Sequence, residues 1–187
     1  AQSHIGLARA LARDPQMRER RRAIITAPAS VRSVGEAVMA ADRLLETAKA
    51  QADAQVSERN AREKAELMRQ LGMGEGESAT KASRTMIRQL EEDQKRRSKR
   101  ALTDAIDRAL IDLLAIYRDV LMVQVGGDGE LINTDLSDLV HEIAQDSTPR
   151  QTLARVDHIE TARKRLVSNG NPLLVLEDMA ISLRPQA

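Results

Sequence analysis

The sequence predicts an all-α protein: a helical bundle with a long, protruding antiparallel helical hairpin. Apolar residues recur with a helical period in almost every segment, and no segment has a convincing strand pattern. Hydrophobic residues make up 42% of the 187 residues, yet they include no Phe, no Trp and a single tyrosine, Tyr117. A core of Leu, Ile, Val, Ala and Met suits close helix–helix packing.

The first elements predicted are two short helices. Residues 2–13 place apolar side chains on one side, and Asp14-Pro15 predicts the start of a second helix, which runs to about Ala27. Asp is a favoured N-cap residue, and Pro is favoured at the first helical position. Pro28 is expected to end this helix.

Two long helices are then predicted to form the hairpin. The first begins near Ser30 and the second near Thr80. Their apolar stripes lie at the two outer ends: Val34, Val38, Ala41, Leu45 and Ala48, and Leu102, Ile106, Ala109, Leu113, Tyr117 and Val120. Residues at about 50–100 are polar nearly all round, and the glycine-rich stretch 72–78 predicts a flexible tip. Antiparallel pairing satisfies both patterns, with the apolar ends packed in the bundle.

Three further helices follow a loop at 126–133. Residues 121–125 continue the preceding helical stripe rather than form a strand. The second of the three helices starts with a capping box of Thr148 and Gln151, and its stripe is Leu153, Val156, Ile159, Ala162 and Leu166. Asn169-Gly170 is expected to end it, and Asn171-Pro172 to cap and open the last helix.

The last helix is apolar around most of its circumference. A fold core needs only one face of such a helix, so a second apolar face predicts an interface with another protein. The candidate interface residues are Leu173, Leu174, Leu176, Met179, Ile181 and Leu183.

Motifs for catalysis, metals and cofactors are missing from the sequence. There is no cysteine, no P-loop motif, and no pair of histidines at ligand spacing among His4, His141 and His158. We therefore expect no ATPase site, no metal, no cofactor and no small-molecule substrate in this chain. The acid–base alternative at His141, beside Asp138 and Glu142, is less favoured than helix-surface charge.

Basic residues cluster at 18–22 and 95–100, although the net charge is only +1. The second cluster supplies candidate DNA contacts: Lys95, Arg96, Arg97, Lys99 and Arg100. Lysine and arginine side chains contact nucleic-acid phosphates, but no aromatic residues flank these clusters for base stacking. The alternative is a solvated helix face with ion pairs to the acidic residues one turn earlier.

The sequence shows no signal peptide and no apolar run near the roughly 18 residues of a membrane span. With the absence of cysteine, this predicts a cytoplasmic protein with no membrane partner. The chain begins in helical rhythm without an initiator Met, which indicates a fragment of a larger protein.

Three stretches resemble the delta-prime subunits of bacterial DNA polymerase III clamp loaders. Residues 155–183 share an Asn-x-Asn-Pro step followed by a leucine-rich helix, and the resemblance falls on Arg165, Leu166, Asn169, Asn171, Pro172, Leu173, Leu176 and Glu177. Residues 113–126 resemble the Tyr-Arg-Asp helix of the family at Tyr117, Arg118 and Asp119. Residues 4–14 resemble the last helix of an AAA+ lid at Gly6, Arg9, Ala10 and Leu11. The polar hairpin departs from the plainer family pattern.

The resemblance implies a collar domain in a ring of clamp-loader subunits. Residues 1–27 would be the end of an AAA+ lid and a connecting helix, and 28–187 the C-terminal helical collar domain, including the hairpin arm at about 50–100. Its partners would be the gamma/tau and delta subunits, with DNA reached indirectly through the complex. Arg9 would be the lid arginine, with a structural or interface role. The subunit would be a rigid, non-catalytic component of the clamp loader in DNA replication.

Two other interpretations remain open at this stage. The chain could be a helical nucleic-acid-binding module that uses its basic helix faces, or an enzyme fragment whose active site lies upstream. Binding to DNA would weaken steeply with salt, whereas an apolar collar contact would not.

Because the arm has few apolar positions, it should be the least stable part of the chain. We expect amide hydrogen exchange to be fastest at 72–78 and slow at 34–48 and 105–121. Mass-spectrometric exchange measurements would check this, and strong protection at 72–78 would show that something packs there.

Overall fold

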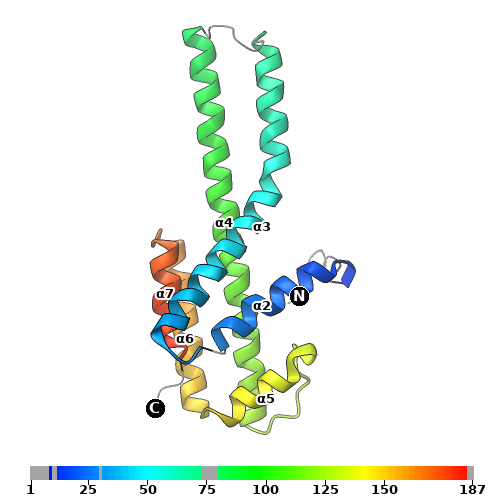
Figure 1. The fold of residues 1–187 in the computed structure, drawn as a ribbon, viewed down its shortest axis with the longest axis vertical. Coiled ribbons are helices and arrows are strands. Elements are labelled where there is room, and N and C mark those ends of the chain that lie inside the picture. The colour runs from blue at the N-terminus through cyan, green and yellow to red at the C-terminus, as the bar shows by residue number, and fades with distance from the viewer. Residues whose placement is uncertain (1–8, 10–11, 30, 73–79, 185–187) are drawn as a thin grey trace. The chain divides into compact units, whose positions relative to one another are not determined.

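The computed structural model describes residues 9, 12–29, 31–72 and 80–184. These residues form six α-helices, a short 3-10 helix and no strand (Figure 1). The elements are α2 (Pro15–Ala29), α3 (Val34–Gln70), α4 (Lys81–Gln124), η1 (Thr134–Leu136), α5 (Ser137–Gln145), α6 (Pro149–Val167) and α7 (Pro172–Ser182). The all-α helical bundle predicted from the sequence is confirmed. The helix predicted at 2–13 lies almost entirely outside the described residues.

The chain divides into two compact units. The first comprises residues 1–47 and 106–187, and holds α2, the start of α3, the end of α4 and all the later helices. The second comprises residues 48–105, in which the end of α3 and the start of α4 run side by side as a helical hairpin (Figure 1). We refer to them as the bundle and the arm.

Short polar side chains fix where the long helices begin. Ser33 Oγ accepts a hydrogen bond from the backbone N–H of Glu36 at 3.2 Å, and the Glu36 carboxylate accepts from the backbone N–H groups of Arg32 and Ser33. This capping box starts α3 at Val34, four residues after the predicted position. Thr80 Oγ1 accepts from the Ser83 N–H at 3.1 Å just before α4.

Two details of the early helices differ from the sequence prediction. Helix α2 runs to Ala29, so Pro28 lies in its last turn and does not end it. Val34 and Val38 are 49% and 37% exposed, although the stripe predicted them to face the core. The buried arc of α3 is centred on its alanines, which allow close helix approach, so the valines lie at the rim of that arc.

The core of the bundle combines faces of α3, α4, α5, α6 and α7. It contains Ala37, Ala40, Ala41, Leu44, Leu45, Ile106, Leu110, Leu113, Ile116, Tyr117, Val120, Val140, Ile159, Ala162, Leu166, Leu176 and Met179. The predicted α4 stripe is buried throughout its bundle portion, from Ile106 to Val120. On α6 the stripe holds from Ile159 onward, but Leu153, in the first turns of α6, is 50% exposed.

The arm packs through small residues and polar bridges. Ala52, Val56 and Ala101 form a buried cluster with Leu102 against it. Farther along, Arg97 donates to Asn60 Oδ1 at 2.7 Å and to Glu63 Oε2 at 2.8 Å. Hydrogen bonds from Arg97 and then Arg59 lower the pKa of Glu63 to about 2. The arm is therefore joined by charged side chains where it has few apolar ones.

One buried carboxylate ties the end of α4 to the loop that follows it. Asp119 is fully buried, and its oxygens accept hydrogen bonds from the backbone N–H groups of Ile132 and Asn133, at 3.1 and 2.8 Å. Asn133 Nδ2 and Arg118 Nη1 also donate to it, at 2.9 and 2.7 Å. Burial alone would raise the pKa of Asp119, but these hydrogen bonds outweigh it and hold the pKa below 3.8.

The same network reaches α2. Arg21 Nη2 donates to Asn133 Oδ1 at 2.6 Å, and Arg21 Nε lies 3.2 Å from Asp112 Oδ1. Asn133 thus joins the Asp119 carboxylate to the Arg21 guanidinium. Three segments, α2, α4 and the loop before η1, are fixed to one another by these contacts.

We predict that Asp119→Asn lowers the free energy of unfolding by about 2–4 kcal/mol at neutral pH, because backbone donors lose a buried carboxylate acceptor. The stabilisation is complete above the unfolded-state pKa of 3.8 and is lost as pH falls through the lower folded-state pKa. The difference in the free energy of unfolding between variant and parent should therefore narrow as the pH falls below 3.8. Urea denaturation would measure this, with Asp157→Asn at an exposed position as control. Equal loss in both variants would contradict the prediction.

Candidate interaction surface

The turn between α6 and α7 sets the direction of the last helix. Asn169 has a left-handed φ of 62°, and the Gly170 N–H donates to the Arg165 carbonyl at 2.8 Å. A Cβ at position 170 would lie 2.8 Å from that carbonyl oxygen and 3.0 Å from Val175 Cγ2. A side chain cannot fit there without a shift of backbone, so this position requires glycine.

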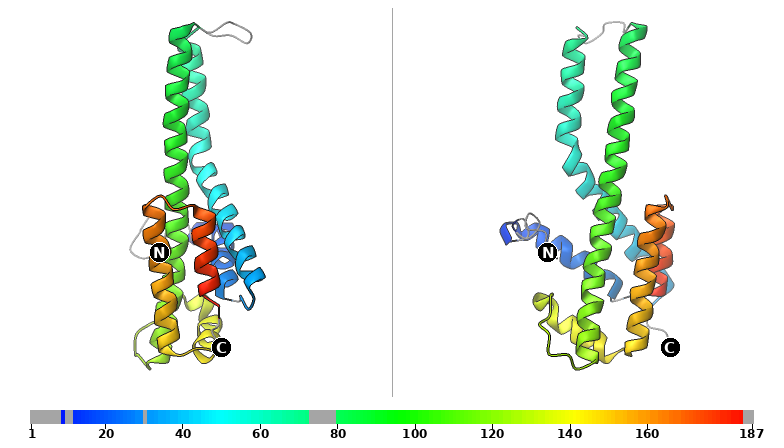
Figure 2. Two further views of the ribbon diagram at one scale, coloured as in Figure 1. Left: turned by 90° about the vertical axis from the view of Figure 1, so that its left-hand side faces the viewer. Right: turned by 180° about the vertical axis from the view of Figure 1, so that it is seen from behind.

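The start of α7 follows at once. Asn171 Oδ1 accepts from the Leu173 and Leu174 N–H groups, at 3.0 and 3.4 Å, and Pro172 occupies the first helical turn. Helices α6 and α7 then run side by side in opposite directions (Figure 2), and Arg165 forms an ion pair with Asp178 across them. The predicted cap and helix start are confirmed.

Three of the six candidate interface residues are buried inside the bundle. Leu176 is 0% exposed, and Met179 and Leu183 are each 2% exposed. Val175 and Ala180 are buried beside them. This side of α7 packs against its own fold and offers no surface to another chain.

The other three candidates lie at the surface of the bundle. Leu174 is 62% exposed, while Leu173 and Ile181 are half-buried. Leu174 and Ile181 are seven residues apart, so they lie on one face of the helix. We call Leu173, Leu174 and Ile181 the α7 outer surface.

The remaining candidate residues lie elsewhere. Arg9 is exposed, and its sequence neighbours in the lid-like motif fall outside the described residues. In the arm, Lys95, Lys99 and Arg100 are exposed, Arg96 pairs with Asp93 at 2.6 Å, and Arg97 bridges to Glu63. The basic run is thus partly neutralised by carboxylates of the arm itself.

The described residues contain no group of three or more His, Cys, Asp and Glu side chains that could hold a metal ion. His141 Nδ1 lies 2.8 Å from the Ser137 carbonyl of its own helix, His158 is exposed, and His4 is outside the described part. Burial raises the pKa of Tyr117 to about 12, and the Arg155 guanidinium lies 5.9 Å from its ring centroid. Within the described ranges, no helix is long and apolar enough to cross a membrane.

The bundle, its glycine-dependent corner and its last helix with the exposed Leu174 define an all-α helical-bundle domain. A family model described as "DNA polymerase III, delta subunit, C terminal" matches residues 79–184, which is more than half of the chain. The chain belongs to this family. The matched region runs from the start of α4 through α7 and includes Asp119, the loop residues that donate to it, and the α6–α7 corner.

A curated relative supports the same assignment. The chain is 36% identical over 72 residues to DNA polymerase III subunit delta' of Bacillus subtilis (strain 168). The aligned part is 38% of this chain and 22% of the relative, so the chain spans only about a fifth of that protein. No solved structure matches the chain.

Sequence reasoning missed two features of this region. It assigned no structural role to Asn133, which accepts a hydrogen bond from Arg21 and donates two to Asp119. It also could not divide the apolar faces of α7 between core and surface. The first had a usable signal, an Asn at the end of a loop just before a helix.

The two sides of α7 should respond differently to a charge. Met179→Glu should lower the free energy of unfolding by about 3–5 kcal/mol, because it buries a carboxylate in the core. Leu174→Glu should change it by only about 0.5 kcal/mol or less, since residue 174 is mostly in water. Thermal or urea unfolding would check both, and a comparable loss in Leu174→Glu would show that this residue is a core element.

Proposed function

We propose that this chain is the C-terminal part of a non-catalytic, structural subunit of the DNA polymerase III clamp loader. In this proposal, residues 28–187 form the collar domain, and residues 1–27 are the end of an AAA+ lid and its connecting helix. The collar associates with the gamma/tau and delta subunits so that the complex can load the sliding clamp during DNA replication. Family membership and an exposed leucine surface on the last helix support it.

The observation that carries the proposal is the exposure of Leu174. A 62% exposed leucine at the start of α7 is held rigidly by the Asn171 cap and the Gly170 corner. Covering a leucine in an interface contributes about 1.5–3 kcal/mol. Together with Leu173 and Ile181, it supplies an apolar patch of the kind found at the centre of subunit contacts.

The bundle also suits a rigid structural role. The Asp119 network joins α4, its following loop and α2, and the links from Arg21 fix the connecting helix to the collar. Movement of α2 would break buried hydrogen bonds. These contacts support the proposal of a subunit that keeps one arrangement of these segments within the ring.

Catalysis and direct DNA binding are assigned to other parts of the complex. ATP hydrolysis belongs in this proposal to the ATP-binding subunits, and Arg9 has a structural or interface role. DNA is reached indirectly, no small-molecule substrate is involved, and the protein works in the cytoplasm. The alternative of a nucleic-acid-binding module gains no support from the family or the relative.

The test is assembly with purified gamma and delta subunits. Leu174→Glu should keep the helical spectrum and melting temperature but weaken assembly at least about tenfold, because a charge replaces an apolar contact worth about 1.5–3 kcal/mol. Size-exclusion chromatography and titration calorimetry would measure this.

Val125→Glu is a matched control, because Val125 is 61% exposed and lies outside α7. It should assemble as the parent does. If the Leu174→Glu and Ile181→Glu variants both assemble normally, the interface lies away from the α7 outer surface. Failure of the parent chain to join either subunit would overturn the proposed function.

A further inference from the structure

Four polar side chains join the two helices of the arm at one level. Arg97 Nη1 of α4 donates to Asn60 Oδ1 of α3 at 2.7 Å and to Glu63 Oε2 at 2.8 Å. Gln94, one turn away on α4, donates through Nε2 to the backbone carbonyl of Asn60 at 2.9 Å. All four residues are half-buried. We call Asn60, Glu63, Gln94 and Arg97 the clasp.

On one side of the clasp, apolar packing holds the helices together. Ala52, Val56 and Ala101 are buried in one cluster, and Leu102 packs against it. Stabilisation by apolar burial does not depend on charge, so dissolved ions do not screen it. We call this side, residues 48–59 and 98–105, the proximal arm.

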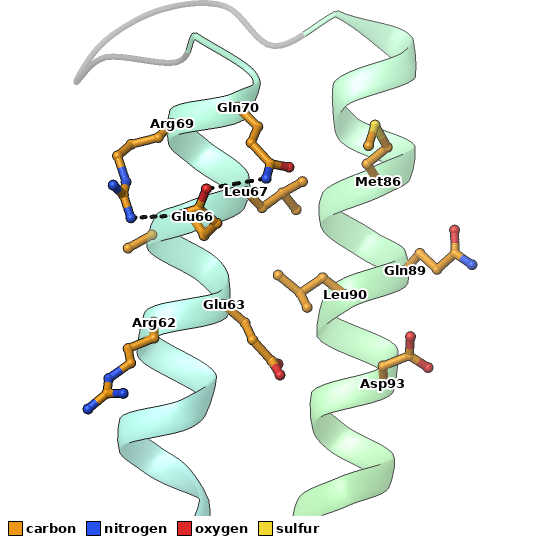
Figure 3. A pocket seen from close by; sticks show the side chains of 11 residues that line it. Arg62, Glu63, Glu66, Leu67, Arg69, Gln70, Met86, Gln89, Leu90 and Asp93 are labelled. Carbon is orange, nitrogen blue, oxygen red and sulfur yellow. Dashed lines mark hydrogen bonds and ion pairs between the residues drawn. The ribbon is translucent and has the colours of Figure 1, made fainter.

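On the other side of the clasp, the helices border an open groove. It has a volume of about 730 Å³, and Leu67 and Leu90 project into it from the two helices (Figure 3). Both leucines are only half-buried, and Met86, which also lines the groove, is 49% exposed. We call this side, residues 64–72 and 80–93, the distal arm. Apart from Ser83, none of its described residues is buried, so apolar burial contributes little to its closure.

The charged contacts between the helices are accessible to dissolved ions. In the distal arm, Lys64 Nζ lies 3.3 Å from Glu91 Oε1, and both side chains are 55% exposed. An ion pair of this exposure stabilises little. Water also reaches the clasp, because the side chains of Arg97 and Glu63 are 26% and 29% exposed. Salt should therefore weaken the contacts that close the distal arm.

Salt concentration, rather than pH, is the variable that acts on the clasp. Hydrogen bonds from Arg97 and then Arg59 lower the pKa of Glu63 to about 2, and a guanidinium does not lose its proton in proteins. Both partners therefore stay charged near neutral pH. The Debye length falls from about 10 Å at 0.1 M salt to about 3 Å at 1 M, which is close to the length of these contacts.

We propose that the clasp is a salt-sensitive latch that closes the distal arm. With the clasp formed, the distal helices lie side by side, and Leu67 and Leu90 face the groove between them. When ions weaken the contacts of Arg97, the distal helices separate while the proximal arm stays packed. The latch thus sets how far the apolar side chains of the groove are open to the solvent. It does not depend on the proposed function.

Spin labels in the whole 187-residue chain test this directly, because the chain has no cysteine of its own. Gln70→Cys with Thr85→Cys labels the distal arm, and Ala54→Cys with Asp104→Cys labels the proximal arm. All four positions are exposed. In double electron–electron resonance, the mean distance of the distal pair should lengthen by at least about 5 Å, half a helix diameter, between about 0.1 M and about 1 M salt. The distance of the proximal pair should not change.

Two substitutions should open the distal arm at about 0.1 M salt. Arg97→Gln removes the guanidinium that donates to both Asn60 and Glu63, and Glu63→Gln removes the charge that Arg97 faces. Arg97→Gln should lengthen the mean distance of the distal pair by at least about 5 Å. Glu63→Gln should shift it in the same direction. In both variants this distance should respond less to salt than in the parent.

The matched control is Arg88→Gln, which removes the same charge from the same helix. Arg88 is 83% exposed and pairs with Glu92 one turn away within α4, so it is outside the clasp. This variant should keep the distance of the parent at about 0.1 M salt. An equal opening in this variant would show that the arm senses only its overall charge, and would overturn the proposal.

Three other outcomes also contradict the latch. One is a distal distance in the parent that is the same at low and high salt. Another is an Arg97→Gln variant that keeps the distance of the parent. If the proximal pair separates together with the distal pair, the arm opens as a whole, and the clasp does not divide it.

Discussion

The Asp119 carboxylate is the constraint on which the bundle depends most. It is removed from water, and it is stabilised there because two backbone N–H groups, an amide and a guanidinium donate to it. Such a group is strongly destabilising if any partner is lost, since an unpaired buried charge cannot be hydrated. The loop after α4 is therefore held in one position. Arg21 of α2 donates a hydrogen bond to Asn133 of this loop, so the same contacts also fix α2.

A second local constraint, the α6–α7 corner, determines what the last helix offers to a partner. Left-handed Asn169, the close approach at Gly170 and the Asn171 cap fix both the direction and the rotation of α7. Rotation decides that Val175, Leu176 and Met179 enter the core while Leu174 stays in water. The proposed collar contact thus follows from a turn several residues before it.

The helices of the arm are joined by different kinds of side chain from those of the bundle. Its helices meet through alanines and a valine, and beyond these through Arg97, Asn60 and Glu63. Small side chains bury little area, so the arm draws less stabilisation from the hydrophobic effect than the bundle does. The same small residues leave room for grooves along its sides.

The sequence by itself determined the all-α class, the Thr148–Gln151 capping box, the α6–α7 stop and start, and the family resemblance, because these depend on local spacing and on residues a few positions apart. It placed Val34 and Val38 in the core, which was wrong, and it could not decide which flank of α7 is buried, since both helices carry apolar residues on more than one side. Val34, Val38 and Leu174 are exposed only because neighbouring helices cover other faces. The Asn133 bridge joins residues 112 positions apart, and the hydrogen bond from Arg97 to Asn60 joins the two helices of the arm. Periodicity carries no information about such pairs, so only the tertiary structure brings them together.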